Sequence, residues 1–432
     1  MRAAPLDRRK FLELGALAGS ALALGGLPGC SSAAMEAPAF SSAGRQRVHD
    51  LMASYVDSGV VPGMVTLLRR QGELHVDAIG LSAFGGAPMR RDSIFRIASM
   101  TKPITAAATM ILVEEGKVSL DQPVDEWLPE LANRKVLTRP DGPLDDTVPA
   151  NRAITVRDLL ALTMGFGLMF PFDAYPVQKA AIELAVSIVP PRPQASPDPD
   201  EWIRRLGTLP LMHQPGEQWM YNTGSDVLGV LIARASGQAL DVFLRERIFL
   251  PLGMKDTGFS VPPSKLDRLA ACYYFNPESG AVELFDDASN SEWNRAPPFL
   301  SGAGGLVSTI DDFLAFGAMM LNKGTHEGGR ILSAQSVNSM TTDQLTPEQK
   351  AVSGLAPGYF ANQGWGFGLA MVTGADDVSP RPGRYGWDGG FGTYWFNDPA
   401  QDFIGILMTQ RSIDDMSPAH AFWKAAFQAM EE

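Results

Sequence analysis

Short apolar segments bounded by turn residues occur in two regions, one near each end of the chain, and both regions read as strands. Residues 64–69 and 74–80 form a predicted hairpin that turns at residues 70–73. Near the other end, residues 394–397 and 403–408 flank a second predicted turn. Both ends of the chain therefore supply strands to the predicted sheet.

Between these strands, apolar residues recur mostly at helical spacing. One helix is predicted over residues 43–57, and a long Ala-rich helix over residues 99–115 is ended by Gly116. Thr155 is placed to cap a further helix. The other predicted helices cover residues 156–162, 225–235, 240–249 and 419–430, and the one over 240–249 is expected to stop before Pro251.

This order of elements predicts an α+β fold, in which an antiparallel sheet built from both chain ends is flanked by helices. One domain over residues 43–432 is expected, with a mostly helical region inserted at about 118–260 and an active cleft between that region and the sheet. Residues 166–209 include a stretch, 190–200, that is too rich in proline for a core element. We interpret them as an excursion beside the cleft, and a passive surface loop is the alternative.

Composition narrows the classes of function. Of the 432 residues, 45% are hydrophobic and 19% are charged, which is typical of a globular protein. The formal net charge is -12, from 36 Lys and Arg against 48 Asp and Glu. An acidic chain does not favour phosphate backbones or acidic membrane surfaces, so no nucleic-acid partner is expected.

Residues 1–29 resemble a twin-arginine export signal that ends in a lipoprotein box. An Arg-Arg-Lys sequence precedes the apolar run 14–27, which is shorter than the ~20 residues of a membrane-spanning helix. Cleavage before Cys30 would expose a thiol for lipid attachment, with residues 30–42 as a tether. The protein is then exported and is periplasmic or a membrane-anchored lipoprotein, touching a membrane only through this lipid. An ordinary cleaved signal with a chance cysteine is the alternative.

The remaining cysteine and the histidines give no sign of a cofactor. Cys272 lies in an apolar stretch and is predicted to be a small buried residue. The two cysteines and five histidines show no metal-ligand spacing, so we expect no metal and no other cofactor.

Ser99 and Lys102 form the only Ser-x-x-Lys pattern in the chain. Side chains three residues apart on a helix project from one face and can touch. In the first turn of its helix, Ser99 would lie beside unpaired backbone N–H groups, and burial would lower the pKa of Lys102 enough to supply a neutral base. Alone, the pattern also fits a capping serine and a solvated lysine, so it needs partners.

Tyr221 and a glycine-rich segment are the candidate partners. A phenol near an ammonium group ionises more easily, so Tyr221 could share a proton with Ser99 and Lys102, although alone it reads as an ordinary half-buried aromatic residue. Residues 386–393 include four glycines, which let the backbone approach a ligand closely. The N–H groups of Gly390 and Ser99 would form the oxyanion hole of a tetrahedral acyl intermediate.

The order of these motifs resembles that of the β-lactamase-related serine hydrolases, which share the fold of penicillin-binding proteins and class C β-lactamases. Ser99-x-x-Lys102, Tyr221 and Trp387-Asp388-Gly389 stand at about the spacing of that family, and most closely of its esterases, the family VIII type carboxylesterases. The resemblance runs from about residue 43 to the C-terminus. It implies that Ser99, Lys102 and Tyr221 are catalytic.

Departures from the lactam-processing relatives bear on the substrate. Where those relatives have a basic residue that meets a substrate carboxylate, this chain has Trp387, and where they have Asn two places after the tyrosine, it has Thr223. Asp388 adds a carboxyl group beside the site. Together with Gly389, these are the candidate substrate-binding residues, and they favour an uncharged small-molecule ester. The resemblance to esterases implies short acyl chains.

The sequence therefore predicts a serine carboxylesterase. Lys102, or Tyr221 as a phenolate, would take the proton of Ser99, which attacks the ester; Tyr221 would protonate the leaving alcohol, and water would cleave the acyl-enzyme. The Gly-x-Ser-x-Gly elbow of α/β-hydrolases is absent. A β-lactamase or D-amino-acid peptidase is the first alternative, and a non-catalytic exported binding protein is the second.

Overall fold

The computed structural model describes residues 39–432, apart from residues 170, 172–173, 413–415 and 432. The predicted export signal, Cys30 and most of the predicted tether lie outside the described residues. The expectation that the tether extends to residue 42 is wrong at its end. Phe40 is fully buried and packs edge-on against Phe403 of the sheet, with ring centres 6.4 Å apart, and Ser41 already caps the first helix.

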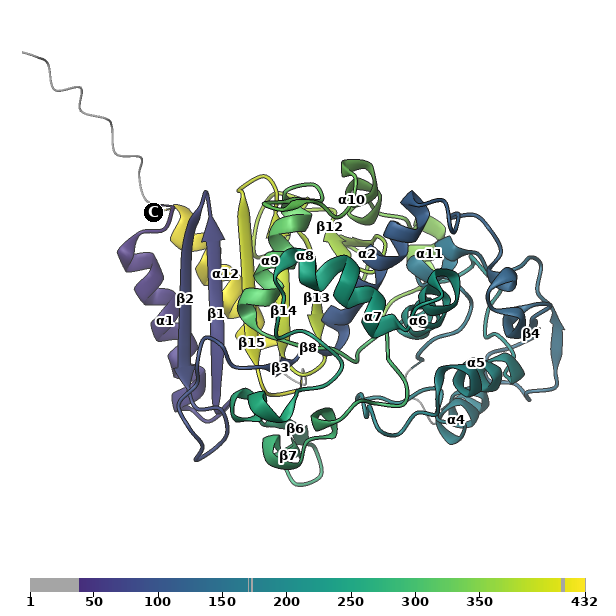
Figure 1. Ribbon diagram of the computed structural model, residues 1–432, viewed down its shortest axis with the longest axis horizontal. Helices are drawn as coiled ribbons and strands as arrows, with labels where there is room; N and C mark the ends of the chain where they lie inside the picture. Colours follow the sequence, from purple (N-terminus) through teal and green to yellow (C-terminus); the bar gives the residue numbers. More distant parts are fainter. Residues whose placement is uncertain (1–38, 170, 172–173, 413–415, 432) are drawn as a thin grey trace, which may run out of the picture. The chain divides into compact units, whose positions relative to one another are not determined.

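Seven antiparallel strands form the main sheet, and they come from both ends of the chain (Figure 1). In spatial order they are β11 (Gln363–Trp365), β12 (Ala370–Val372), β13 (Tyr385–Gly389), β14 (Thr393–Asp398), β15 (Phe403–Thr409), β1 (Gly63–Arg70) and β2 (Glu73–Gly80). β1 and β2 are the predicted hairpin, and β14 and β15 are the predicted late strands. Because β15 pairs with β1, the two chain ends meet inside the sheet, as predicted.

Helices cover both faces of this sheet. Met64 and Leu68 of β1 face one apolar cluster, and Val65 and Leu67 face the other, so the strand is buried on both faces from Gly63 to Leu68. The covering helices are α1 (Ser42–Asp57) and α12 (Ser417–Glu431) on one face, with α2 (Thr101–Glu114) and α9 (Ile310–Leu321) on the other. The active-site elements described below lie on the side of α2.

In the segment predicted to be mostly helical, two of the predicted helix ends carry clear caps. Thr155 and Asp158 form a capping box, and Gly237, with a φ of +71°, ends a long helix. The helices here are α3 (Val156–Leu160), α4 (Pro176–Glu183), α5 (Pro199–Thr208), α6 (Thr223–Ser236), α7 (Leu240–Leu244), the π-helical turn η5 (Arg245–Phe249) and α8 (Leu250–Leu252).

The structure departs from the predictions at two prolines. The helix expected to stop before Pro251 continues through it to Leu252, because the preceding turn is π-helical and its wider backbone accommodates the proline ring. Pro199, which we had assigned to the proline-rich excursion, is the first residue of α5, where its missing N–H costs nothing. That helix buries Trp202 and Ile203, so this part of the excursion does contribute to the core.

Short elements complete the described fold. They are the strand pairs β3 (Phe95–Arg96) with β8 (Val307–Ser308), β4 (Lys135–Leu137) with β5 (Thr147–Pro149), β6 (Cys272–Asn276) with β7 (Ala281–Asp286) and β9 (Thr325–His326) with β10 (Gly329–Arg330), the helices α10 (Ala334–Met340) and α11 (Pro347–Val352), and the 3-10 helices η1 (Ala98–Met100), η2 (Val124–Glu126), η3 (Pro129–Leu131), η6 (Pro263–Arg268), η7 (Ala288–Asn290) and η8 (Glu292–Asn294). Cys272 is buried, as predicted.

Within the described ranges, no helix taken singly has the length and apolar character needed to cross a membrane. The two segments Thr223–Ser236 and Leu240–Leu252 meet that test only when joined, and they are bent by 82° at their junction.

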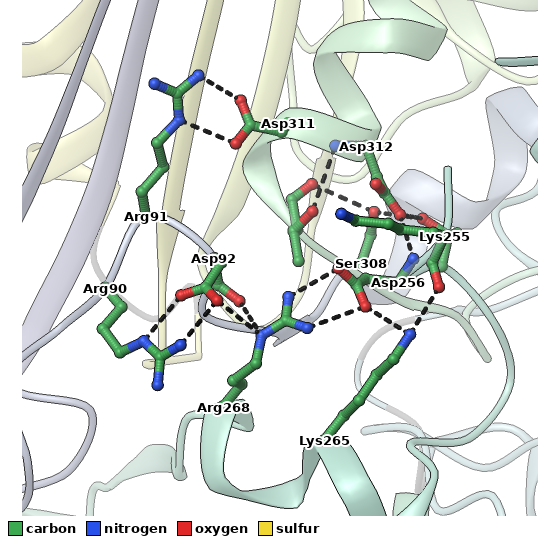
Figure 2. A network of polar contacts seen from close by, with 12 residues as sticks. Arg90, Arg91, Asp92, Lys255, Asp256, Lys265, Arg268, Ser308, Asp311 and Asp312 are labelled. Carbon is green, nitrogen blue, oxygen red and sulfur yellow. Dashed lines mark hydrogen bonds and ion pairs between the residues drawn. The ribbon is translucent and has the colours of Figure 1, made fainter. Parts of the chain in front are cut away.

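A network of ion pairs fixes the chain that leads into β3 (Figure 2). Arg268, at the end of η6, bonds both carboxyl oxygens of Asp256 at 3.0 and 2.7 Å, and its Nε donates to the carbonyl oxygen of Asp92 at 2.8 Å. Arg91 pairs with Asp311 in the first turn of α9 at 2.7 Å. The segment before β3 is therefore tied to α9 and to η6.

Candidate active site

The candidate nucleophile lies in a short, strained turn. Ser99 belongs to the 3-10 helix η1, and α2 begins only at Thr101. The prediction that Ser99 lies in the first turn of the long helix is therefore wrong, because Ser99 lies in the short helix that precedes it. Lys102 follows in the first turn of α2, and its Nζ reaches Ser99 Oγ at 3.0 Å. Ala98 has a φ of +41°, and strain of this kind costs about 1–3 kcal/mol.

Buried contacts hold this turn in place. Arg96 of β3 forms a buried ion pair with Asp286 and donates to the carbonyl oxygen of Ala270 at 2.5 Å. From the sheet, the hydroxyl of Thr393 donates to the carbonyl oxygen of Ile97 at 3.2 Å. The turn is therefore held on both sides, which allows its strained backbone to persist.

The amine of Lys102 has the contacts of a general base. The side chain is fully buried, and Nζ lies 3.0 Å from Ser99 Oγ, 2.6 Å from Asn222 Oδ1 and 2.7 Å from the carbonyl oxygen of Ala303. Burial lowers the pKa of Lys102 to about 7, and the charge of Asp226 opposes this shift. The carbonyl oxygens of Asn222 and Ala303 can only accept. A neutral amine therefore gives them its two hydrogens and turns its lone pair to the hydroxyl of Ser99.

Asp226, in the first turn of α6, supports this arrangement from behind. Its Oδ1 accepts hydrogen bonds from Ser301 Oγ at 2.6 Å and from the N–H of Ala303 at 3.1 Å. It thereby holds the loop whose carbonyl group faces Lys102. Burial raises the pKa of Asp226, while the hydrogen bond from Ser301 and the charge of Lys102 lower it.

Tyr221 completes the cluster, so the structure brings Ser99, Lys102 and Tyr221 together. The hydroxyl of Tyr221 is hydrogen-bonded to Ser99, and it accepts from the indole N–H of Trp387 at 2.9 Å. Burial raises the pKa of Tyr221 well above its ordinary value, although both hydrogen bonds act in the opposite direction. The phenol therefore stays protonated. Because the indole can only donate, the phenol hydrogen is free to point to Ser99, which favours a proton donor over the phenolate base.

The glycines of the third motif differ in their surroundings. A Cβ atom on Gly389 would meet the carbonyl oxygen of Ile97 at 2.2 Å, so this glycine lets β13 pack against the nucleophile turn. It is not among the residues that line the cleft, contrary to its prediction as a substrate-binding residue. A Cβ on Gly390 would meet nothing within 4 Å, and Gly390 lines the cleft together with Ser99, as an oxyanion hole requires.

Trp387, Asp388 and Thr223 all border the cleft, but Trp387 does so differently from the prediction. Only 6% of Trp387 is exposed, so it offers the substrate little of the apolar face that we predicted. Its indole packs on Tyr221 and edge-on against Trp365, with ring centres 5.6 and 4.6 Å apart. Its main contact is thus with the phenol, which it holds in place.

Sequence reasoning missed three groups around Lys102. Asn222 has a φ of +103° and a ψ of −58°, outside the left-handed helical region that Asn favours, so its backbone is strained. Its place between Tyr221 and a predicted helix is the signal that could have pointed to it. Asp226 reads as an ordinary acid at a helix N-terminus. The carbonyl group of Ala303 belongs to the backbone and leaves no residue signature.

The cluster opens into a cleft of about 600 Å³. Residues 186–193 of the proline-rich excursion line it, so that part of the excursion does lie beside the cleft. Apolar side chains such as Trp202 and Phe299 form much of the wall. A cleft of this volume accommodates a drug-sized ligand.

Comparisons with known proteins agree on one family. A family model described as "Beta-lactamase" matches residues 48–429. The chain is 40% identical over 367 residues to Protein Rv1367c of Mycobacterium tuberculosis, covering 83% of this chain and 88% of that protein. It is 32% identical over 380 residues to Esterase EstB of Burkholderia gladioli, covering 82% of this chain and 87% of that protein.

Solved structures confirm the predicted fold. EstCE1, described as a hydrolase with promiscuous acyltransferase activity, superposes with a TM-score of 0.73 at 24% identity, covering 91% of this chain and 100% of that one. A class C beta-lactamase superposes with a TM-score of 0.65 at 17% identity, covering 90% of this chain and 97% of that one.

We expect Asp226→Asn to move the acidic limb of the kcat/KM profile to lower pH. Asn can accept the same two hydrogen bonds through Oδ1, but it removes the negative charge that raises the pKa of Lys102. The base then stays neutral further into acid, by about one pH unit for a buried charge nearby. Ester hydrolysis measured from pH 5 to pH 9 checks this, and an unchanged limb would mean that Asp226 carries no charge in the free enzyme.

We expect Trp387→Phe to lower kcat for ester hydrolysis about fivefold, the cost of about 1 kcal/mol for one lost hydrogen bond to Tyr221. Trp365→Phe is the matched control, because the buried indole nitrogen of Trp365 has no hydrogen-bond partner in the described structure. Equal losses in both variants would show that packing, and not the bond to Tyr221, is what matters.

Proposed function

The chain belongs to the beta-lactamase family, and on this basis we propose that this serine hydrolase is a carboxylesterase that forms an acyl-enzyme on Ser99. The observation that carries the proposal is the buried amine of Lys102, whose two other neighbours can only accept hydrogens. The esterase named among its relatives, EstB, supports the same class of reaction.

In the acylation step, the lone pair of Lys102 takes the hydroxyl proton of Ser99 while Oγ attacks the ester carbonyl carbon. The carbonyl oxygen becomes an oxyanion, and the backbone N–H groups of Ser99 and Gly390 stabilise it. The carbon–oxygen bond to the alcohol then breaks. Tyr221 gives its proton to the leaving alkoxide and recovers one from the ammonium of Lys102.

In the deacylation step, water replaces the alcohol. Tyr221 and Lys102 act in reverse, taking a proton from water as it attacks the acyl-enzyme and returning one to Ser99 Oγ as the acid leaves. The raised pKa of Tyr221 and the lowered pKa of Lys102 bring the two groups to the protonation states that this cycle needs at its start, a phenol and a free amine.

The charges of the cleft argue for esters without a carboxylate near the reacting bond. Trp387 stands where a basic residue would meet such a carboxylate, and Asp388 follows it. Arg192 also lines the cleft, but Glu292 neutralises it through a hydrogen bond of 2.6 Å. These features disfavour β-lactams and peptides with a free carboxylate, which are the substrates of the first alternative.

The volume of the cleft indicates the size of the substrate. A cleft of about 600 Å³ is far larger than a short acyl chain requires. We therefore propose a short acyl group joined to a bulky alcohol that bears no carboxylate. The second alternative, a binding protein without chemistry, leaves the strained turn at Ser99 and the buried amine of Lys102 without a purpose.

Purified protein should hydrolyse a chromogenic butyrate ester much faster than a chromogenic cephalosporin, and Ser99→Ala should lower ester turnover at least about a thousandfold, because the acyl-enzyme cannot form. A fluorophosphonate should add one label to wild-type protein and none to Ser99→Ala, as read by intact mass. Faster cephalosporin turnover would favour the β-lactamase alternative, and ester turnover that survives Ser99→Ala would refute the nucleophile.

We also propose that the protein is exported and carries lipid on Cys30, on the grounds of the twin-arginine-like signal at residues 1–29. Metabolic labelling with a fatty-acid analogue should mark the wild-type protein and not Cys30→Ser. Labelling that persists in Cys30→Ser would refute Cys30 as the site of the lipid, and its absence from both proteins would favour the ordinary cleaved signal.

A further inference from the structure

The carboxyl group of Asp388 lies in the wall of the cleft, and no cationic side chain among the described residues pairs with it. It follows Trp387 in β13 and borders the cleft, while its Oδ1 is buried and has no hydrogen-bond partner. Within the described residues it forms no ion pair. A buried polar atom without a partner costs about 1–3 kcal/mol, so such a group calls for an explanation.

The other charged groups that line the cleft are compensated. Arg192 is paired with Glu292. Asp226 accepts two hydrogen bonds and lies in the field of Lys102. An ionised Asp388 therefore leaves the cleft with an excess of negative charge.

Burial raises the pKa of Asp388 to about 7, so the group is largely ionised only above neutral pH. The titratable groups that sense its charge are the phenols of Tyr221 and Tyr359, and both stay neutral because burial raises their pKa values. No cation among the described residues stabilises the carboxylate. Since Oδ1 is enclosed, a positive charge in the cleft would act on it through space, in a medium that screens poorly.

Aromatic rings accompany this carboxyl group. Tyr221 and Tyr359 line the same cleft and are partly exposed, and both phenols lie close enough to Asp388 to feel its charge. Rings of this kind attract cations through their negative faces, most effectively when water is excluded. A carboxylate next to aromatic rings is the chemistry that recognises a quaternary ammonium group.

The position of Asp388 also says which part of the ester it would meet. Tyr221 is the proposed proton donor to the leaving alcohol, so the alcohol must lie beside its hydroxyl group. Asp388 is near enough to raise the pKa of that hydroxyl. In the bound ester, the alcohol part therefore lies closer to Asp388 than the acyl part does.

We propose that Asp388 and the rings beside it form a subsite for a cationic group on the alcohol part of the substrate. This inference rests on the proposed esterase function and deepens it: the preferred substrates are esters of alcohols that carry a quaternary ammonium.

Two esters with the same acyl group and nearly the same shape test the subsite. Butyrylcholine has a trimethylammonium group where 3,3-dimethylbutyl butyrate has a neutral tert-butyl group. At pH 8.5, wild-type kcat/KM should be at least tenfold higher for the cationic ester. At pH 5.5 the ratio should fall toward one, because Asp388 is then protonated. The protonation of Lys102 affects both esters alike and cancels in the ratio.

In Asp388→Asn, the ratio should be near one at both pH values. Asp141→Asn is the matched control, since Asp141 is exposed and does not line the cleft, and it makes the same change in net charge. It should keep the wild-type ratio. The wild-type pH series tests the subsite even if Asp388→Asn does not fold.

The outcomes separate this inference from the proposed function. Hydrolysis of the neutral ester with no preference for the cationic one overturns the subsite and leaves the esterase standing. If neither ester is hydrolysed, the esterase proposal fails, and calorimetry decides the subsite by itself. Ser99→Ala protein should then bind butyrylcholine at pH 8.5 at least tenfold more tightly than Ser99→Ala/Asp388→Asn protein, and equal affinities would overturn it.

Discussion

The buried amine of Lys102 is the constraint on which the rest of the structure depends. An amine removed from water must find hydrogen-bond partners for its two hydrogens and for its lone pair. Here the three partners come from three separate parts of the chain. Ser99 lies in the turn before α2, Asn222 precedes α6, and Ala303 belongs to a loop that Asp226 holds. These parts can meet at one nitrogen only when α2, α6 and the sheet pack as they do. The packing of α2 and α6 against the sheet thus also assembles the site around Lys102.

The backbone is strained at two residues that flank the site of the Lys102 amine. Ala98 and Asn222 have positive φ angles, and each stands next to a reacting side chain. The surrounding contacts hold these conformations: Thr393 bonds the carbonyl group of Ile97, and Gly389 leaves the room for β13 to come that close. A rigid turn keeps the hydroxyl of Ser99 aimed at the amine without reorganisation, which is how strained backbone serves catalysis.

The fold could be predicted because its signals are local. Short apolar strands at both ends, helices between them and the three-residue spacing of Ser99 and Lys102 each follow from neighbouring residues. The errors fall where long-range packing decides. Gly389 and Gly390 look alike in a sequence, yet one accommodates the nucleophile turn and the other borders the cleft. Trp387 reads as an apolar surface, and only the fold shows that its N–H is bonded to Tyr221.

The central claim is that Lys102 is a neutral base, and titration of its amine in the intact protein tests this most directly. Lysines labelled with ¹³C at Cε can be followed by NMR from pH 5 to pH 11, with the Lys102 signal assigned by its loss in Lys102→Gln. The account predicts a midpoint near 7, because burial removes the amine from water. A midpoint near the ordinary lysine value of about 10.4 would contradict it, since the amine would then be charged and without a lone pair for Ser99.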